Sequence, residues 1–261
     1  MSNVIPQAAC LLIGDELLSG RTQDSNAYHL AKVLNARGLP LVEVRIVPDK
    51  EDMIVTALRE LKARADLVFT SGGIGPTHDD ITAECVAKAL GVSIGEREDA
   101  LKILAQRYEE RGEELTAARR RMARIPDGAF LIPNSVSGAP GFHLDGVFVL
   151  AGVPAIFQAM LNALDEVLPS GPEETVYTVT GELGESLLAD GLRDLESALK
   201  GLKIGSYPGK TGTSGPLAIV CRSPIAKTAE HAALAVQGLF AAQGVTATVE
   251  KGDGRSNADQ A

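Results

Sequence analysis

The sequence has 261 residues, 45% of them hydrophobic, and a formal net charge of −9, which suits one large domain or a medium and a small one. Its acidic balance and lack of tryptophan argue against binding to nucleic acid or a membrane surface, which requires a basic field or stacking rings. The three cysteines form no CxxC pair, and no apolar run reaches the roughly 18 residues of a transmembrane helix, so we expect a protein of the reducing cytoplasm.

The first part of the chain alternates strand-like and helix-like segments. Short apolar runs predict buried strands at residues 8–13, 41–47 and 67–70. Amphipathic segments predict helices from a cap at Asp24 to Gly38, from Asp49 to Leu61, and from Ile81 to Leu90. This βαβαβα order predicts a parallel sheet with helices on both faces.

Residues 98–124 carry many Glu and Arg side chains and predict a solvated helical excursion. We expect Arg121 or Arg124 to reach an anion from it. Strands at 129–132 and 146–150 and a helix over 154–167 are predicted to complete a first domain, residues 1–168.

A linker rich in Pro, Gly and acid is predicted at 169–174. The strands predicted after it are 176–180, 203–207, 217–221 and 245–250, and the helices are 187–199 and 229–242. This βαββαβ order is typical of a small ferredoxin-like α+β domain, expected at 175–251. The polar tail, 252–261, is expected to be disordered.

The segment Thr70 to Asp80 reads TSGGIGPTHDD and leaves the carboxyl end of a predicted strand, where open α/β sheets bind ligands. Its glycines let a ligand approach the backbone, and the N–H groups of the following helix favour a phosphate. It matches neither a Walker loop nor a dinucleotide fingerprint. The alternative is an ordinary glycine turn.

Asp79 and Asp80 follow this loop directly. One acid at a helix start is an ordinary cap, but two beside a phosphate pocket would repel the ligand unless a cation lay between them. Mg²⁺ is commonly held by one or two carboxylates and phosphate oxygens, so the pair predicts a metal or water-positioning site. His78 is interpreted as a surface residue.

The loop after the first strand, Gly14 to Asn26, should lie at the same edge of the sheet. We expect Asp15, Glu16, Ser19 and Asn26 to line one pocket with the glycine loop. A polar turn before a capped helix is the alternative. Two further loops rich in Gly and Pro, 132–141 and 151–154, are candidates to close over a nucleotide.

The motifs IGDELLSG with Asn26, TSGGIGPTHDD with Thr82, and PNSVSGAPGF with LAGVP resemble the CinA-type (competence/damage-inducible) branch of the molybdopterin-binding fold shared by MoaB- and MogA-like proteins. GESLLADGLRDLE and KIGSYPG resemble the small second domain of CinA-type proteins. The resemblance implies a three-layer αβα domain with a mostly parallel sheet, followed by the ferredoxin-like domain. Longer members carry an amidase domain, for which we expect no room in this chain.

The resemblance also implies the roles of residues. Asp79 and Asp80 would be catalytic, and the metal would be held by Asp15, Glu16, Asp79 and Asp80. The phosphate- and nucleotide-binding residues would be Gly14, Ser19, Asn26, Ser71, Gly72, Gly73, Gly75, Pro76, Thr77, Asn134 and Gly141. Ser71 stands where the family commonly has glycine.

Three functions remain open at this stage. The resemblance implies first a pyrophosphatase that hydrolyses an ADP-ribose-like or dinucleotide substrate with Mg²⁺, Mn²⁺ or Co²⁺. The alternatives are a molybdopterin-binding protein of molybdenum cofactor biosynthesis and a non-catalytic nucleotide-binding assembly module. In each case we expect a phosphorylated small-molecule ligand and a homo-oligomer, either a dimer or a trimer, and no nucleic-acid or membrane partner.

Overall fold

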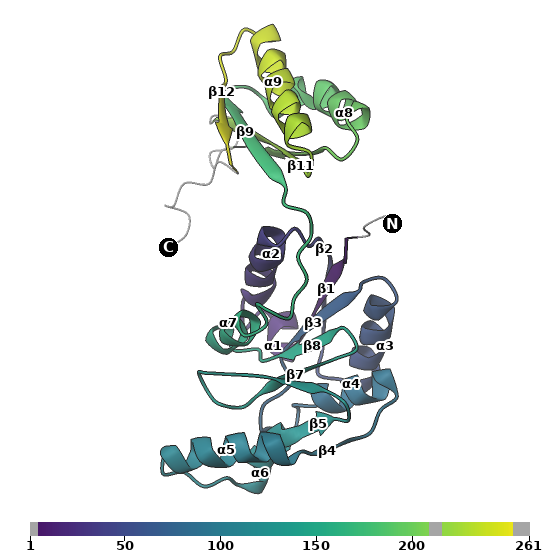
Figure 1. The fold of residues 1–261 in the computed structure, drawn as a ribbon, viewed down its shortest axis with the longest axis vertical. Coiled ribbons are helices and arrows are strands. Elements are labelled where there is room, and N and C mark those ends of the chain that lie inside the picture. Colours follow the sequence, from purple (N-terminus) through teal and green to yellow (C-terminus); the bar gives the residue numbers. More distant parts are fainter. Residues whose placement is uncertain (1–4, 209–215, 253–261) are drawn as a thin grey trace. The chain divides into compact units, whose positions relative to one another are not determined.

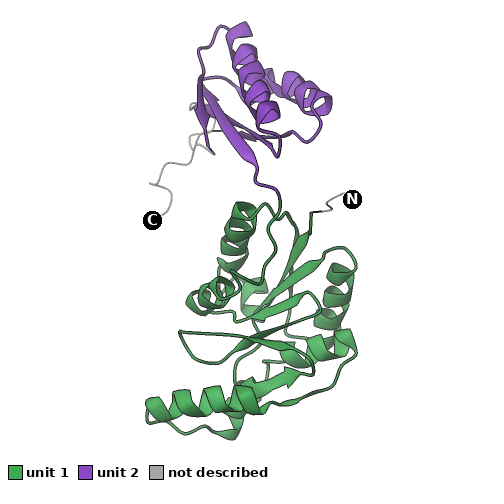
Figure 2. Ribbon diagram, in the orientation of Figure 1, with its two compact units in different colours: residues 1–171 green, residues 172–261 purple. Residues whose placement is uncertain are grey.

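The computed structural model describes residues 5–208 and 216–252 (Figure 1). The chain divides into two compact units, residues 1–171 and 172–261 (Figure 2). Apart from Gly252, the predicted tail lies outside the described residues. No helix of the described residues has the length and apolar character needed to cross a membrane.

Unit 1 is built on a six-stranded sheet with the order β2-β1-β3-β8-β7-β6. Its strands are β1 (Ala8–Ile13), β2 (Leu41–Val47), β3 (Leu67–Ser71), β6 (Phe130–Ile132), β7 (Gly141–Leu144) and β8 (Val147–Leu150). β2, β1, β3 and β8 run parallel, and β7 and β6 join as an antiparallel edge. The mostly parallel sheet predicted from the sequence is confirmed.

Helices cover both faces of this sheet. They are α1 (Asp15–Leu18), α2 (Asn26–Ala36), α3 (Glu51–Lys62), α4 (Thr82–Leu90), α5 (Glu98–Glu110), α6 (Ala117–Arg120) and α7 (Pro154–Asn162). Every residue of β1 is buried because alternate side chains enter opposite layers. Leu11 packs with α3 and α4, whereas Leu12 packs with α2 and α7. Unit 1 is therefore the predicted three-layer α/β structure.

The predicted excursion over 98–124 is wrong as one continuous helix. α5 ends before Gly112, whose φ of 65° breaks the helix, and α6 is capped by Thr116, whose hydroxyl accepts the Arg119 N–H. After a short 3-10 turn, β5 (Arg124–Pro126) pairs antiparallel with β4 (Ile94–Glu96). This small second sheet depends on a partner about thirty residues away in the sequence, which no local pattern reveals.

Further boundaries differ from the prediction, most of them by a few residues, as at β12, which begins at Thr248 instead of Val245. Gly141 begins β7 inside the segment predicted as a loop, because its extended backbone pairs with Ile132 of β6, and the next residue, Phe142, pairs with β8 as well. α7 ends at Asn162 rather than at Val167. α3 begins at Glu51 and has no side-chain cap, because Asp49 bonds elsewhere.

Unit 2 has an antiparallel sheet of order β10-β11-β9-β12. Its strands are β9 (Thr175–Gly181), β10 (Lys203–Tyr207), β11 (Leu217–Ser223) and β12 (Thr248–Lys251), and its helices are α8 (Ala189–Ala198) and α9 (Ala226–Ala242). Val179, Leu192, Ile219 and Phe240 form part of the core between the helices and the sheet. The order and pairing are those of the predicted ferredoxin-like domain.

Candidate functional site

A cavity of about 630 Å³ lies where β1, β3 and β8 end. The loops that leave these three strands all contribute to its wall. Its main polar and glycine residues are Gly14, Glu16, Asp49, Gly72, Gly73, Gly75, Asp79, Asp80, Asn134 and Gly152. The cavity therefore occupies the edge of the sheet that the sequence singled out.

Backbone packed directly against backbone forms the floor of the cavity. Gly72 has a φ of 108°, and a Cβ there would lie 2.2 Å from the Ile13 carbonyl oxygen at the end of β1. A Cβ on Gly152 would lie 3.3 Å from the Gly72 Cα. The Gly72 N–H donates to the Leu150 carbonyl at 3.2 Å, so the ends of the three strands meet at Gly72.

The glycine loop presents its own amides. Thr82 fixes the loop because its N–H donates to the Gly73 carbonyl and its hydroxyl to the Gly72 carbonyl. Within the described residues, the N–H groups of Gly73, Ile74 and Gly75 donate no backbone hydrogen bond, and all three residues line the cavity. Successive free N–H groups in such a loop form an anion-binding concavity. The loop therefore offers amides in addition to the predicted donors at the start of α4.

Asp80 holds the loop in shape. Its Oδ2 accepts the N–H of Thr77 at 2.8 Å and the Thr77 hydroxyl as well. A Cβ at Gly75 would lie 2.7 Å from the same oxygen. Of the two predicted catalytic acids, Asp80 is therefore the one committed to the local fold.

Asp79 lines the cavity with a half-exposed carboxylate. The Thr77 hydroxyl, which is close to both acids although its hydrogen bond goes to Asp80, and the backbone N–H of Asp79 hold the pKa of Asp79 below the ordinary value for aspartate, and the nearby His78 acts in the same direction. His78 itself is almost fully exposed, as interpreted from the sequence. Asp79 therefore stays ionised near neutral pH and offers a fixed negative charge at the cavity.

Asp49 is a third carboxylate in the cavity wall, at the end of β2. Its Oδ2 accepts the Asp15 N–H at 2.9 Å, which orients the side chain. Burial raises the pKa of Asp49, and the nearby negative charges of Glu16 and Asp79 raise it further, although the Asp15 N–H opposes this shift. The cavity thus contains acids whose pKa values are shifted in opposite directions, a pattern typical of acid–base sites.

An Asp49→Asn substitution is expected to raise the melting temperature at neutral pH. The raised pKa means that ionising Asp49 costs the folded state free energy as the pH rises, whereas below the ordinary aspartate pKa the group is protonated in both states. The two proteins should therefore converge in acid. Thermal unfolding from acid to neutral pH measures this, with the exposed Asp127→Asn as control. Equal melting temperatures at neutral pH would contradict the assignment.

The acids do not by themselves enclose a metal. Among the described residues, no three His, Cys, Asp or Glu side chains lie close enough together to hold an ion. Asp79, Glu16 and Asp49 nevertheless line one cavity beside free amides, so a cation shared with ligand phosphates fits the donor set.

Part of the cavity lining is apolar. Tyr108 of α5 and Met122 contribute to it, and so do Val153, Ile156 and Met160 around the start of α7. The guanidinium carbon of Arg119 lies 4.2 Å from the centroid of the Tyr108 ring. The cavity therefore combines polar groups with apolar and aromatic side chains.

Asn26 and Ser71, predicted to bind the ligand, are buried and do not line the cavity. The Asn26 Nδ2 donates to the Ser71 hydroxyl at 2.9 Å and to the Gly152 carbonyl at 2.7 Å. Asn26 thus joins α2 to β3 and to the loop after β8. Its Oδ1 is buried without a hydrogen-bond partner.

Other predicted residues divide between the wall and its supports. Gly14, Glu16 and Pro76 line the cavity. Asn134 lines it too, but its Nδ2 donates to the Ser137 hydroxyl and the Ala139 carbonyl while its Oδ1 accepts two N–H groups, so it shapes its own loop. The predicted residues that are not part of the wall are Asp15, Ser19, Thr77 and Gly141.

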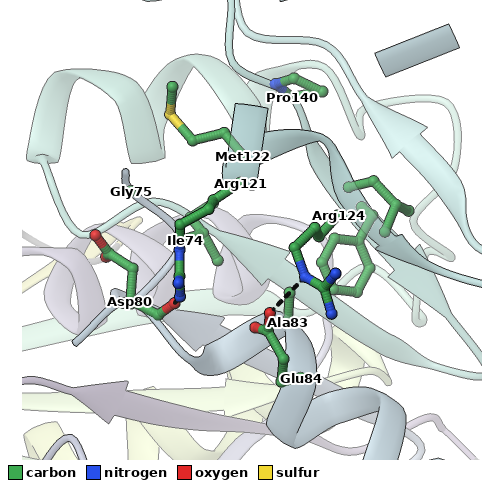
Figure 3. A pocket seen from close by; sticks show the side chains of 12 residues that line it. Ile74, Gly75, Asp80, Ala83, Glu84, Arg121, Met122, Arg124 and Pro140 are labelled. Carbon is green, nitrogen blue, oxygen red and sulfur yellow. Dashed lines mark hydrogen bonds and ion pairs between the residues drawn. The ribbon is translucent and has the colours of Figure 1, made fainter. Parts of the chain in front are cut away.

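The predicted anion-binding arginines lie in a small pocket next to the cavity (Figure 3). The Arg124 Nε donates to Glu84 at 2.8 Å, so its charge is already paired. Arg121 points toward Asp80 in Figure 3, and its Nη2 donates to the Asp80 carbonyl at 3.5 Å. Of the two arginines, Arg121 is the one that contacts the backbone beside the glycine loop, and its binding to an anion stays a prediction.

Several wall residues were absent from the predicted site, among them Asp49 and Tyr108. Asp49 follows β2, and its position at the carboxyl edge could have identified it. Tyr108 lies within the charged α5, where no local signal separates it from a surface residue.

Comparisons place this geometry among known proteins. Residues 9–170 match the family described as a probable molybdopterin binding domain. A protein of Caldivirga maquilingensis is 41% identical over 167 residues, which cover 62% of this chain and 64% of the relative. A CinA-like protein of Chlorobium limicola is 35% identical over 218 residues, 78% of this chain, which spans only 51% of that relative.

A solved structure agrees with the sequence comparisons. The crystal structure of the protein CinA with unknown function from Thermoplasma acidophilum is similar with a TM-score of 0.58 and 36% identity, over 62% of this chain and 98% of that chain. The family match covers the unit that holds the cavity. The chain therefore belongs to the family of probable molybdopterin binding domains and, within it, to the CinA-like proteins.

Proposed function

We propose that unit 1 hydrolyses the phosphoanhydride bond of an ADP-ribose-like or dinucleotide substrate with the help of a divalent cation. The observation that carries this proposal is the run of free N–H groups at Gly73, Ile74 and Gly75, directly beside the carboxylates of Asp79 and Asp49 in one cavity. The amides suit phosphate oxygens, and the acids suit a cation and a water molecule.

The two acids suit different tasks. Asp79, with its lowered pKa, is a permanent charge suited to a cation that neutralises the phosphates and polarises the phosphorus. Asp49, with its raised pKa, is the better proton acceptor. In the proposed reaction the water oxygen bonds to phosphorus, the bridging P–O bond breaks, Asp49 takes the water proton, and one phosphate leaves with the electron pair.

Binding of molybdopterin is the second candidate. It is favoured by the family match over 9–170. The free amides of the glycine loop serve the phosphate of a pterin as well as that of a nucleotide, and the apolar part of the lining accommodates either ring. A deletion strain that keeps normal molybdoenzyme activity would count against this candidate without affecting the first.

The hydrolase is tested with purified protein, ADP-ribose, and Mg²⁺, Mn²⁺ or Co²⁺ in turn. Release of AMP that requires the cation is expected. Thermal shift with the nucleotide, with and without cation, reports binding separately. Binding without AMP release under any cation would leave only the non-catalytic functions for this substrate.

Replacing Tyr108 with Leu is expected to weaken binding of a ring-bearing ligand about tenfold or more, because base–aromatic stacking is worth about 1–3 kcal/mol. Tyr108→Phe keeps the ring and should bind nearly as well as the wild type. Isothermal titration with ADP-ribose and with inorganic pyrophosphate measures both. Equal losses for both ligands would mean that Tyr108 only supports the fold.

A further inference from the structure

Glu16 contributes an unpaired carboxylate to the cavity wall. It belongs to the short helix α1, directly after β1. Its carboxylate lies against the main chain, since a Cβ added at Gly14 would lie 2.5 Å from each of its two oxygens. Among the residues that the structure describes, this carboxylate accepts no hydrogen bond and forms no ion pair. The wall therefore contains a hydrogen-bond acceptor that nothing within the chain uses.

The backbone that carries Glu16 is fixed by its own loop. The Glu16 carbonyl accepts the Thr22 N–H at 3.1 Å and the Ser19 hydroxyl at 3.2 Å. These bonds fold the segment between β1 and α2 back onto α1. Thr22 lines the cavity as well, and within the described ranges its hydroxyl has no hydrogen-bond partner. The loop thus brings a carboxylate and a hydroxyl to the same cavity.

The other polar groups of the wall already have partners or suit other parts of a ligand. Asp80 and Asn134 are occupied by hydrogen bonds within their own loops. The free amides of the glycine loop suit phosphate oxygens, and Asp79 and Asp49 suit a cation and a water molecule. The negative charge of Glu16 would repel a phosphate. Glu16 therefore remains for a neutral part of the ligand that donates hydrogen bonds.

A ribose carries the donors that fit this acceptor. Its two adjacent hydroxyls can both donate to one carboxylate, because an ionised carboxylate has two accepting oxygens and donates nothing. Acidic side chains bind ribose hydroxyls in this way in dinucleotide-binding α/β sheets. A divalent cation is the alternative partner of Glu16. Among the described residues, however, no three His, Cys, Asp or Glu side chains lie close enough together to enclose one.

We propose that Glu16, with Thr22 beside it, binds the adjacent hydroxyls of a ribose in the substrate and so selects ribose phosphates over phosphates without those hydroxyls. The inference rests on the proposed function for the class of ligand. It does not require hydrolysis, because the ribose binds whether or not the phosphoanhydride bond is cleaved. Glu16 is thus a specificity-determining residue, whereas Asp79 and Asp49 serve the reaction.

AMP and ribose 5-phosphate are the probes, because they are the two halves of ADP-ribose and neither contains a phosphoanhydride bond. Their binding can therefore be titrated calorimetrically with the cation present and without turnover. Glu16→Ala should bind at least one of them about tenfold or more weakly, since hydrogen bonds to a charged group contribute that much. Its melting temperature should not fall, because the Glu16 carboxylate has no partner in the described chain.

The hydroxyl groups are tested with analogues that lack them. For 2′,3′-dideoxy-AMP or 2-deoxyribose 5-phosphate, the difference between wild type and Glu16→Ala should shrink or vanish, because the lost partner is missing on both sides. Asp52→Ala is the matched control. Asp52 is an exposed acid in the first turn of α3 that does not line the cavity, so its removal should leave binding unchanged.

Three results would overturn the proposal. The first is a loss in Glu16→Ala that is equally large for inorganic phosphate and for the deoxy analogues, which would mean that Glu16 acts through the cation. The second is no loss for either ribose phosphate. The third is a wild type that binds both no more tightly than inorganic phosphate. A loss that depends on the hydroxyls, in a protein that releases no AMP from ADP-ribose, would instead refute the proposed hydrolysis and leave the ribose site in place.

Discussion

A Gly72→Ala variant is expected to lose ligand binding and much of the stability of unit 1. The φ of 108° at Gly72 alone costs another residue on the order of 1–3 kcal/mol. The added Cβ would also lie 2.2 Å from the Ile13 carbonyl oxygen, and neither backbone can move without separating β1 from β3. The melting temperature and the nucleotide thermal shift measure the two losses.

Gly91→Ala is a control that separates the cost of a positive φ from the cost of a steric clash at the added Cβ. Gly91 ends α4 with a φ of 72°, yet a Cβ there would meet no atom within 4 Å. This control should pay only the conformational cost and keep its full response to nucleotide. Two results would contradict the role of Gly72 in forming the cavity floor. One is a Gly72→Ala protein as stable as Gly91→Ala, and the other is a Gly72→Ala protein that binds nucleotide normally.

The glycine loop could be located from the sequence because two independent patterns agree on it. An apolar run predicts β3, and glycines directly after it predict a backbone that closely approaches its neighbours. Gly72 and Gly73 do adopt positive φ, and both line the cavity. The ligand-binding edge of the sheet can therefore be predicted from the sequence where a buried strand is followed directly by glycines, because glycine is favoured there for its backbone conformation.

Side-chain roles were less predictable because they depend on which partner a polar group finds. Asn26 and Ser71 have the right chemistry for a ligand, but they are buried and the Asn26 amide donates to the Ser71 hydroxyl. Asp49 has the chemistry of a helix cap, but it bonds to Asp15 instead. Tyr108 enters the wall only because α5 is placed by the β4–β5 pair, whose partners are remote in sequence.

An Asp79→Asn variant is expected to lower kcat for cation-dependent hydrolysis on the order of 10²-fold or more while the fold stays intact. Asp79 is half exposed and supports no loop hydrogen bond to another residue's backbone, so removing its charge affects the cation and phosphates rather than the structure. Steady-state kinetics across cation concentrations measure the effect, which should include a higher cation requirement.

Asp80→Asn should behave differently, although it removes the same charge one residue away. Its Oδ2 accepts from both the backbone and the hydroxyl of Thr77, and the oxygen of an amide would accept both bonds more weakly because it carries no negative charge. The loop that presents the free amides then loosens. We expect KM to change by a larger factor than kcat, and the melting temperature to fall. If the two variants changed kcat and KM in the same proportion, Asp79 would not differ from Asp80 in role. The adjacent acids would then act as one site, instead of Asp79 supplying charge for the reaction and Asp80 supporting the loop.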